Sequence, residues 1–166
     1  MIRKLTHKNE VESEKVKHLE KLSDLLKESD ISIFSTSGKE IFKDLTIEFY
    51  EVIGELLEEI GFKNVSVTRN GDTNNRMDAI IIDNVRTIPI EIKSPKEVMY
   101  VNTKSIRQAL ENKIVLTSRK FYPTENNVTS LAIGYEYPND RSGVSEIIED
   151  IFNTFGFVIG AIDLGS

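Results

Sequence analysis

The chain contains no cysteine, four prolines and only two histidines in 166 residues. The absence of cysteine excludes disulfides, thiolate metal sites and cysteine nucleophiles. It is compatible with a reducing cytoplasm, where we expect the protein to act. No apolar run reaches about 18 residues, so the sequence predicts neither a membrane-spanning helix nor a membrane partner. His7 and His18 lie too far apart in a charged segment to suggest a pair of metal ligands.

Acidic residues outnumber basic ones, and the formal net charge of −6 argues at first against a nucleic-acid-binding protein. The charge is unevenly distributed, because residues 63–120 carry eleven Lys and Arg against six Asp and Glu. DNA is contacted through a local basic face rather than through total charge. The middle of the chain is therefore where a DNA-binding surface is expected, although lysines scattered over a small domain would give the same counts.

The apolar pattern predicts a charged extension, residues 1–35, followed by an α/β catalytic domain over residues 36–166. Within the extension, residues 9–29 are expected to form a helix that serves as a linker or joins two chains. A second, amphipathic helix is predicted from about Lys39 to Ile60, and Gly61 is a natural stop. The apolar stripe of this helix consists of Phe42, Leu45, Phe49, Val52, Ile53, Leu56, Leu57 and Ile60.

The remaining elements are predicted from shorter apolar segments and from the turn residues between them. Two further helices are expected at 104–112 and 145–155. Strands are expected at 65–67, 77–82, 87–93, 114–116, 131–135 and 157–162. This order predicts a mixed β-sheet flanked by helices. The chain stops soon after its last apolar strand, which is compatible with a fragment of a longer protein.

Charged residues interrupt two predicted strands: Asp78 lies in the first, and Glu91 and Lys93 lie in the second. Side chains alternate along a strand, so Glu91 and Lys93 share one face. A hairpin with a two- or four-residue loop would pair Asp83 with Arg86 and Asp78 with Glu91. Opposed residues have Cβ atoms about 5 Å apart, where like charges are destabilising. A loop of odd length would shift this register by one residue.

Two opposed carboxylates are costly unless they share a cation. A hard divalent ion with oxygen ligands, Mg²⁺ above all, would satisfy Asp78 and Glu91. Lys93 would then lie beside the metal, where it could orient or deprotonate an attacking water. The alternative is a structural ion pair, in which Lys93 only neutralises one of the two acids. Spacing alone leaves both interpretations open.

Asp78, followed after twelve residues by Glu91-Ile92-Lys93, resembles the signature of the PD-(D/E)XK nuclease superfamily, which includes type II restriction endonucleases. The resemblance covers roughly residues 40–135 and includes the family's α-β-β-β-α-β core order. Met77 stands where the family name has proline. The resemblance implies a restriction-endonuclease-like fold and hydrolysis of phosphodiester bonds. Mg²⁺, or Mn²⁺ in its place, would be held by Asp78, Glu91 and the Ile92 carbonyl, and Lys93 would position the water.

The resemblance also implies roles for residues on the neighbouring helices. Members of the family often add a metal-binding glutamate from the helix before the first core strand, and Glu48, at the border of the apolar stripe, is the first candidate. Glu55 is the reserve. Gln108 corresponds to a glutamine that related nucleases often carry near the active centre. Lys104 and Arg107, three residues apart, could contact phosphates. A solvated helix face is the alternative for all of them.

The predicted loops contain four further basic residues that suit phosphate contacts: Arg69, Arg76, Arg119 and Lys120. Such contacts position DNA without reading its sequence. Little other surface remains outside the core elements, whereas specific DNA interfaces typically bury about 1,000 Å² or more. We therefore expect these 166 residues to lack most of a sequence-reading surface.

Together these observations predict a Mg²⁺-dependent endodeoxyribonuclease of the restriction-endonuclease type that acts on double-stranded DNA. One alternative is a repair or junction-resolving nuclease with the same core. Another is a non-catalytic DNA-binding or scaffold domain. Cutting both strands with one centre per chain usually needs two chains, so a homodimer, or dimerisation on DNA, is expected. The helix at 9–29 or at 145–155 would supply its apolar seam.

Overall fold

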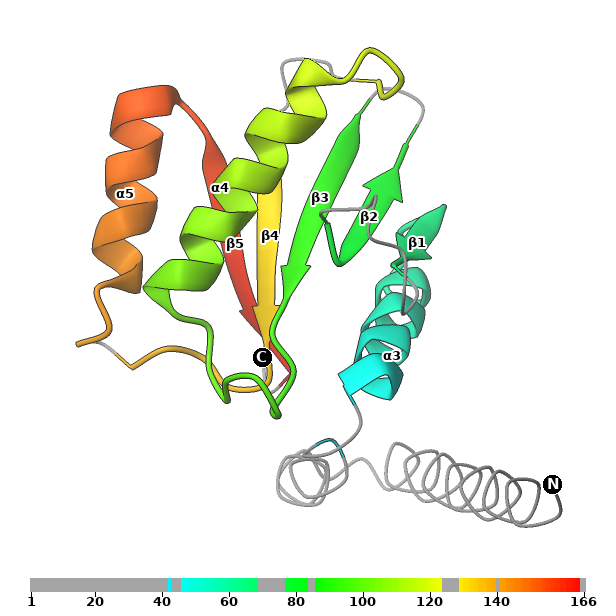
Figure 1. Cartoon of the computed structure of the whole chain (residues 1–166), viewed down its shortest axis with the longest axis horizontal. Helices are drawn as coiled ribbons and strands as arrows, with labels where there is room; N and C mark the ends of the chain where they lie inside the picture. Colours follow the sequence, from blue (N-terminus) through cyan, green and yellow to red (C-terminus); the bar gives the residue numbers. More distant parts are fainter. Residues whose placement is uncertain are drawn as a thin grey trace, which may run out of the picture. The chain divides into compact units, whose positions relative to one another are not determined.

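A five-stranded mixed sheet and three helices make up the described part of the chain (Figure 1). The computed structural model describes residues 42, 46–68, 77–83, 86–123, 129–139 and 141–164. The extension expected at residues 1–35, with its helix at 9–29, lies outside the described residues. No helix among the described residues is long and apolar enough to cross a membrane.

The strands lie side by side in the order in which they occur in the chain, β1-β2-β3-β4-β5. Their bounds are Val65–Val67 for β1, Ala79–Ile82 for β2, Thr87–Ile92 for β3, Thr129–Gly134 for β4 and Val158–Asp163 for β5. β2 pairs antiparallel with both β1 and β3, whereas the β3–β4 and β4–β5 pairs are parallel. The expected α/β class with a mixed sheet is therefore confirmed.

Helix α3 (Thr46–Glu59) precedes β1 and buries the side chains of Phe49, Ile53 and Leu57. Gly54 allows the helix to approach the sheet closely, because a Cβ atom at this position would lie 2.7 Å from Val67 Cγ2. The helix ends as predicted before Gly61, whose φ is +105°. The placement of Ile60 in the apolar stripe was wrong: the residue follows the last helical turn and is 74% exposed.

Helix α4 (Thr103–Ser118) corrects a second expectation, because the apolar residues 114–116 continue this helix and do not form a strand. A short apolar run fits a strand and a buried helix equally well. Here the helical period decides, since Leu116 extends the buried stripe of Ile106, Ala109 and Lys113 while Ile114 is 48% exposed. Asn102 and Ser105 form a reciprocal capping box that fixes where the helix begins.

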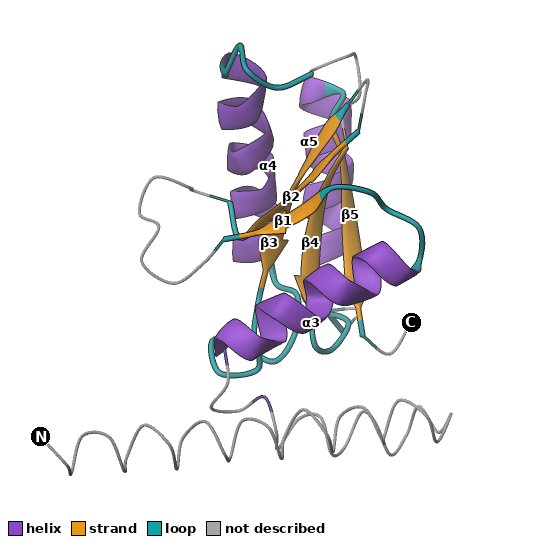
Figure 2. Ribbon diagram, turned by 90° about the vertical axis from the view of Figure 1, so that its right-hand side faces the viewer, coloured by secondary structure: helices purple, strands orange, loops and turns teal. Residues whose placement is uncertain are grey.

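Helices α4 and α5 (Val144–Phe155) lie next to each other against the same face of the sheet (Figures 1 and 2). Their contact with β4 and β5 forms one apolar cluster, which consists of Val101, Ile106, Ala109, Ala132, Val144, Ile151 and Ile159. Helix α3 instead packs beside β1, at a steep angle to the strands (Figure 2). The central strand β3 is buried along its whole length between these layers.

One cation is buried between α4 and β3. Lys113 is 3% exposed, and its ammonium donates a hydrogen bond to the Thr87 carbonyl at 3.2 Å. Burial lowers the pKa of this lysine. Sequence analysis gave Lys113 no role, and the structure shows it as part of the attachment of α4 to the start of β3.

Candidate active site

The β2–β3 hairpin has the register that was predicted from spacing. Ala79 pairs with Ile90 and Ile82 pairs with Thr87, while the Asp83 N–H donates to the Arg86 carbonyl at 2.8 Å. The paired residues of β2 begin at Ala79, one residue after Asp78. Asp78 therefore reaches the position next to β3 without being a paired strand residue.

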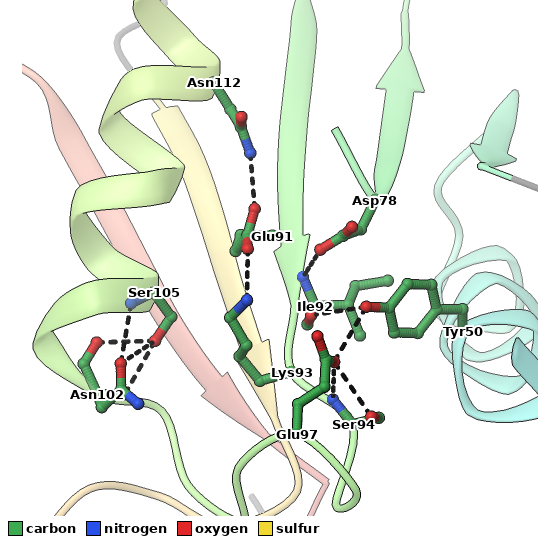
Figure 3. A network of polar contacts seen from close by, with 10 residues as sticks. All are labelled: Tyr50, Asp78, Glu91, Ile92, Lys93, Ser94, Glu97, Asn102, Ser105 and Asn112. Carbon is green, nitrogen blue, oxygen red and sulfur yellow. Dashed lines mark hydrogen bonds and ion pairs between the residues drawn. The ribbon is translucent and has the colours of Figure 1, made fainter. Parts of the chain in front are cut away.

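Asp78 turns its carboxylate toward the main chain of β3. Its Oδ2 accepts a hydrogen bond from the Ile92 N–H at 2.8 Å (Figure 3), and its Oδ1 has no hydrogen bond to any described residue. Burial, followed by the negative charge of Glu91, raises the pKa of the Asp78 carboxyl to about 7. The Ile92 N–H and Lys93 oppose that rise without cancelling it. The protein alone therefore stabilises the Asp78 anion poorly.

Glu91 and Lys93 lie on one face of the end of β3, as alternation predicted. The Lys93 ammonium is 2.8 Å from Glu91 Oε1, and the Asn112 side-chain amide on α4 donates to Glu91 Oε2 at 2.9 Å (Figure 3). Glu91 is 4% exposed. Burial acts to lower the pKa of Lys93, but the hydrogen bond and charge of Glu91, with the charges of Glu97 and Asp78, raise it overall. Lys93 therefore keeps its proton, which favours orienting a water over deprotonating it.

Tyr50 on α3 joins the helix to the far side of this cluster. Its hydroxyl lies 3.3 Å from the Ile92 carbonyl oxygen and 3.1 Å from Glu97 Oε2 (Figure 3). The same Glu97 oxygen accepts hydrogen bonds from the Ser94 N–H and hydroxyl, both at 3.1 Å. Burial, followed by the charges of Asp78 and Glu97, raises the pKa of Tyr50 well above its usual range, so the hydroxyl remains a donor.

The oxygen atoms gathered here fit a hard divalent cation. Asp78 Oδ1 is not engaged with a described residue, the Ile92 carbonyl faces the cluster, and Glu91 keeps acceptor capacity because a carboxylate has about four lone-pair sites. Asp78, Glu91 and Glu97 lie near the Lys93 ammonium, so negative charge is in excess around Ile92. Within the described ranges, no three His, Asp or Glu side chains are placed so that they could hold a metal ion alone. A Mg²⁺ ion would thus depend on Asp78, Glu91 and the Ile92 carbonyl.

The two candidate glutamates of α3 differ in exposure. Glu48 is 9% exposed, whereas Glu55 is on the exposed side of the helix. Glu48 is thus the one that faces the interior, two residues before Tyr50. The structure nevertheless does not gather Glu48, Asp78 and Glu91 into one three-carboxylate group.

On α4, Gln108 precedes Asn112 by four residues, so the two lie on one helical face. Its buried Oε1 has no hydrogen-bond partner among the described residues. A buried acceptor without a partner is rare in folded proteins and calls for a water or a ligand. Lys104 and Arg107 are exposed on the same helix, Lys120 is exposed beyond it, and Arg119 is half-buried. Arg69 and Arg76 lie outside the described residues.

Sequence reasoning missed Tyr50, Glu97 and Asn112. The signal for Asn112 was its place in the inward-facing stripe of α4, where a polar side chain needs a partner. Tyr50 gave no comparable signal, because its partners Ile92 and Glu97 are 42 and 47 residues away in sequence.

No protein-family model matches the chain, and searches of curated proteins and of solved structures found no match either. The case for a function therefore depends on the geometry of the site.

Proposed function

We propose that the protein is a Mg²⁺-dependent endodeoxyribonuclease whose catalytic residues are Asp78, Glu91 and Lys93. The observation that carries the proposal is the juxtaposition of the buried Glu91, the partly buried Asp78 and a main-chain carbonyl at the end of the β2–β3 hairpin, with the Lys93 ammonium beside them. Stabilising both acids as anions requires further positive charge. A divalent ion supplies it.

The element order supports the same proposal. Helix α3, strands β1 to β3, helix α4 and strand β4 follow one another as α-β-β-β-α-β. We propose that this is the restriction-endonuclease-like core, with Asp78 directly before its second strand and the E-x-K sequence spanning the end of its third.

Each residue of the site has a distinct part in the proposed hydrolysis. Asp78, Glu91 and the Ile92 carbonyl would hold Mg²⁺, which when bound polarises the scissile phosphate and stabilises the leaving oxygen. Lys93 donates from its ammonium and orients the attacking water. Asn112 fixes the carboxylate of Glu91, and Tyr50 fixes the Ile92 carbonyl from the opposite side.

The proposed substrate is DNA, cut by a homodimer or by two chains that meet on it, in the cytoplasm. One centre per chain cuts one strand at a time, so two chains account for cutting a duplex. Sedimentation of the protein with and without DNA tests this part, and a strict monomer in both conditions contradicts it.

Incubation with supercoiled plasmid tests the function directly. We expect Mg²⁺ to produce nicked and linear products, and EDTA to prevent them. Glu91→Gln, prepared in parallel, should be inactive, because the amide lacks the ligand charge and binds Mg²⁺ weakly. Equal nicking by Glu91→Gln would contradict the role given to Glu91, and intact plasmid with the unaltered protein and Mg²⁺ would overturn the proposal.

A further inference from the structure

An aromatic side chain stands in solvent beside two cations just after α4. Phe121 is 91% exposed, more than any other large apolar side chain among the described residues. Arg119 and Lys120 directly precede it. Neither cation forms an ion pair with a described residue. The stretch Arg119, Lys120 and Phe121 is called the α4-end surface below.

The residues on either side of Phe121 are held to the domain. The Arg119 N–H donates to the Leu116 carbonyl, Tyr122 packs against the apolar cluster of Met77, Ile80 and Leu116, and the Pro123 carbonyl accepts from the Thr87 hydroxyl at 3.1 Å. Phe121 is therefore presented from a fixed backbone and is not carried on a free end. The α4-end surface lies at the start of β3, the end of that strand opposite to Lys93 (Figure 1).

The surroundings of Phe121 differ from those of Phe152, another exposed phenylalanine. Phe152, which is 54% exposed, lies on α5 close to Glu149 and Asp150. Single exposed apolar residues are common on protein surfaces, and the negative end of α4 favours nearby cations. Neither point accounts for an aromatic ring and two cations in one turn whose backbone is held to the domain. That combination suits a nucleic-acid strand, because bases stack on aromatic rings while cations contact the phosphates.

We propose that the α4-end surface binds single-stranded DNA, with Phe121 stacked on an unpaired base and Arg119 and Lys120 on the flanking phosphates. The segment that follows the α4-end surface is attached to β3 at Thr87, through the Pro123 carbonyl. Thr87 lies four residues before Glu91, or about 13 Å away along the strand. As far as it concerns cleavage, the proposal rests on the nuclease function above. The substrate it implies is DNA with an unpaired segment near the cut.

Binding measured in EDTA separates this proposal from catalysis. We expect Phe121→Ala to weaken the affinity for a fluorescein-labelled single strand about 5- to 100-fold, the range for loss of one base–aromatic stack. Affinity for the matched duplex should change less than about twofold, because paired bases are not available for stacking. Phe152→Ala is the control and should leave both affinities unchanged. Lys120→Gln should reduce the salt dependence of single-strand binding by about 0.7 in log–log slope.

A fluorescent probe tests stacking itself. The chain has no tryptophan, so Phe121→Trp places a single indole in the α4-end surface and Phe152→Trp places one on α5. Single-stranded DNA should quench the emission of the first variant and leave that of the second unchanged. Equal single-strand affinity of Phe121→Ala and the unaltered protein, or no quenching of Phe121→Trp, overturns the proposal.

The two proposals fail in different ways. If Phe121→Ala loses single-strand binding but the unaltered protein cuts no DNA, the α4-end surface stands and the nuclease function fails. If plasmid is cut with Mg²⁺ and Phe121→Ala binds single strands normally, the nuclease function stands and the α4-end surface fails.

Discussion

Lys93→Ala should lose plasmid cleavage by at least about 10²-fold while it still binds Mg²⁺. The substitution removes the ammonium that is proposed to orient the water but leaves Asp78, Glu91 and the Ile92 carbonyl in place. Any stability lost through the uncompensated Glu91 should be recovered on adding Mg²⁺, because the divalent ion neutralises the same carboxylates. Cleavage assays and thermal melts with and without Mg²⁺ measure both effects. Lys96→Ala, an exposed lysine three residues further on, is the matched control and should resemble the unaltered protein.

If Lys93 only forms a structural ion pair with Glu91, the opposite result is expected for Lys93→Ala. In that case Glu91, which is 4% exposed, would lose the ammonium beside it, and the fold would lose about 3–5 kcal/mol of stability. Mg²⁺ would restore none of it, and the unaltered protein would cut no DNA. Undiminished nicking by Lys93→Ala contradicts the role given to the ammonium, and a loss of stability that Mg²⁺ leaves unchanged contradicts the metal site.

Asp78→Asn should make the protein more stable in EDTA at pH 8, although it should abolish the proposed cleavage. The amide oxygen can still accept the Ile92 N–H, whereas the buried negative charge is gone. The pKa of Asp78 is raised from 3.8 to about 7 on folding. Between these values the folded chain keeps a proton that the unfolded chain has lost. The stability that this group contributes therefore falls as the pH rises through that window.

The gain from Asp78→Asn should be on the order of 2–4 kcal/mol at pH 8 and should vanish near pH 4. Chemical denaturation in EDTA across this pH range measures it. Asp83→Asn is the control, because Asp83 lies just after the same strand in an exposed ion pair with Arg86 at 3.5 Å. Loss of this ion pair in Asp83→Asn should change the free energy of unfolding by less than about 1 kcal/mol. An Asp78→Asn protein that is less stable than the unaltered one at pH 8 in EDTA contradicts this account of the site.

The hairpin that carries the candidate site could be predicted from sequence because its register depends only on local spacing. The alternation of Glu91 and Lys93, the short connection between the strands and the apolar pattern of β2 together determine which residues oppose each other. The same local reasoning misassigned residues 114–116, where a β-branched pair resembled a strand although the helical stripe of α4 continued to Leu116. Tertiary packing overrides such short-range preferences.

The supporting residues could not be predicted in this way. Asn112 meets Glu91 only because α4 crosses β3 at that point, and Tyr50 meets Ile92 only because α3 packs beside the sheet. Both contacts depend on how helices dock, which spacing within one segment does not determine. Likewise, the sequence does not show that Gln108 Oε1 is buried and lacks a hydrogen-bond partner among the described residues, because both depend on the packing around it.

The chain-ordered sheet has a consequence for how the protein folds. β2 and β3 can pair as soon as both have been synthesised, but that early hairpin would bring Asp78 and Glu91 together before α4 supplies Asn112. Among the described residues Lys93 forms an ion pair with Glu91 alone, so electrostatic repulsion from Asp78 still opposes pairing at the open end of the hairpin. Strand pairing should begin at Ile82 and Thr87 and should slow near Asp78 and Glu91 until α4 docks or a cation binds. A divalent ion would then act first as a folding ligand and only afterwards as a cofactor. Amide hydrogen exchange at Ile92, with and without Mg²⁺, would report that order.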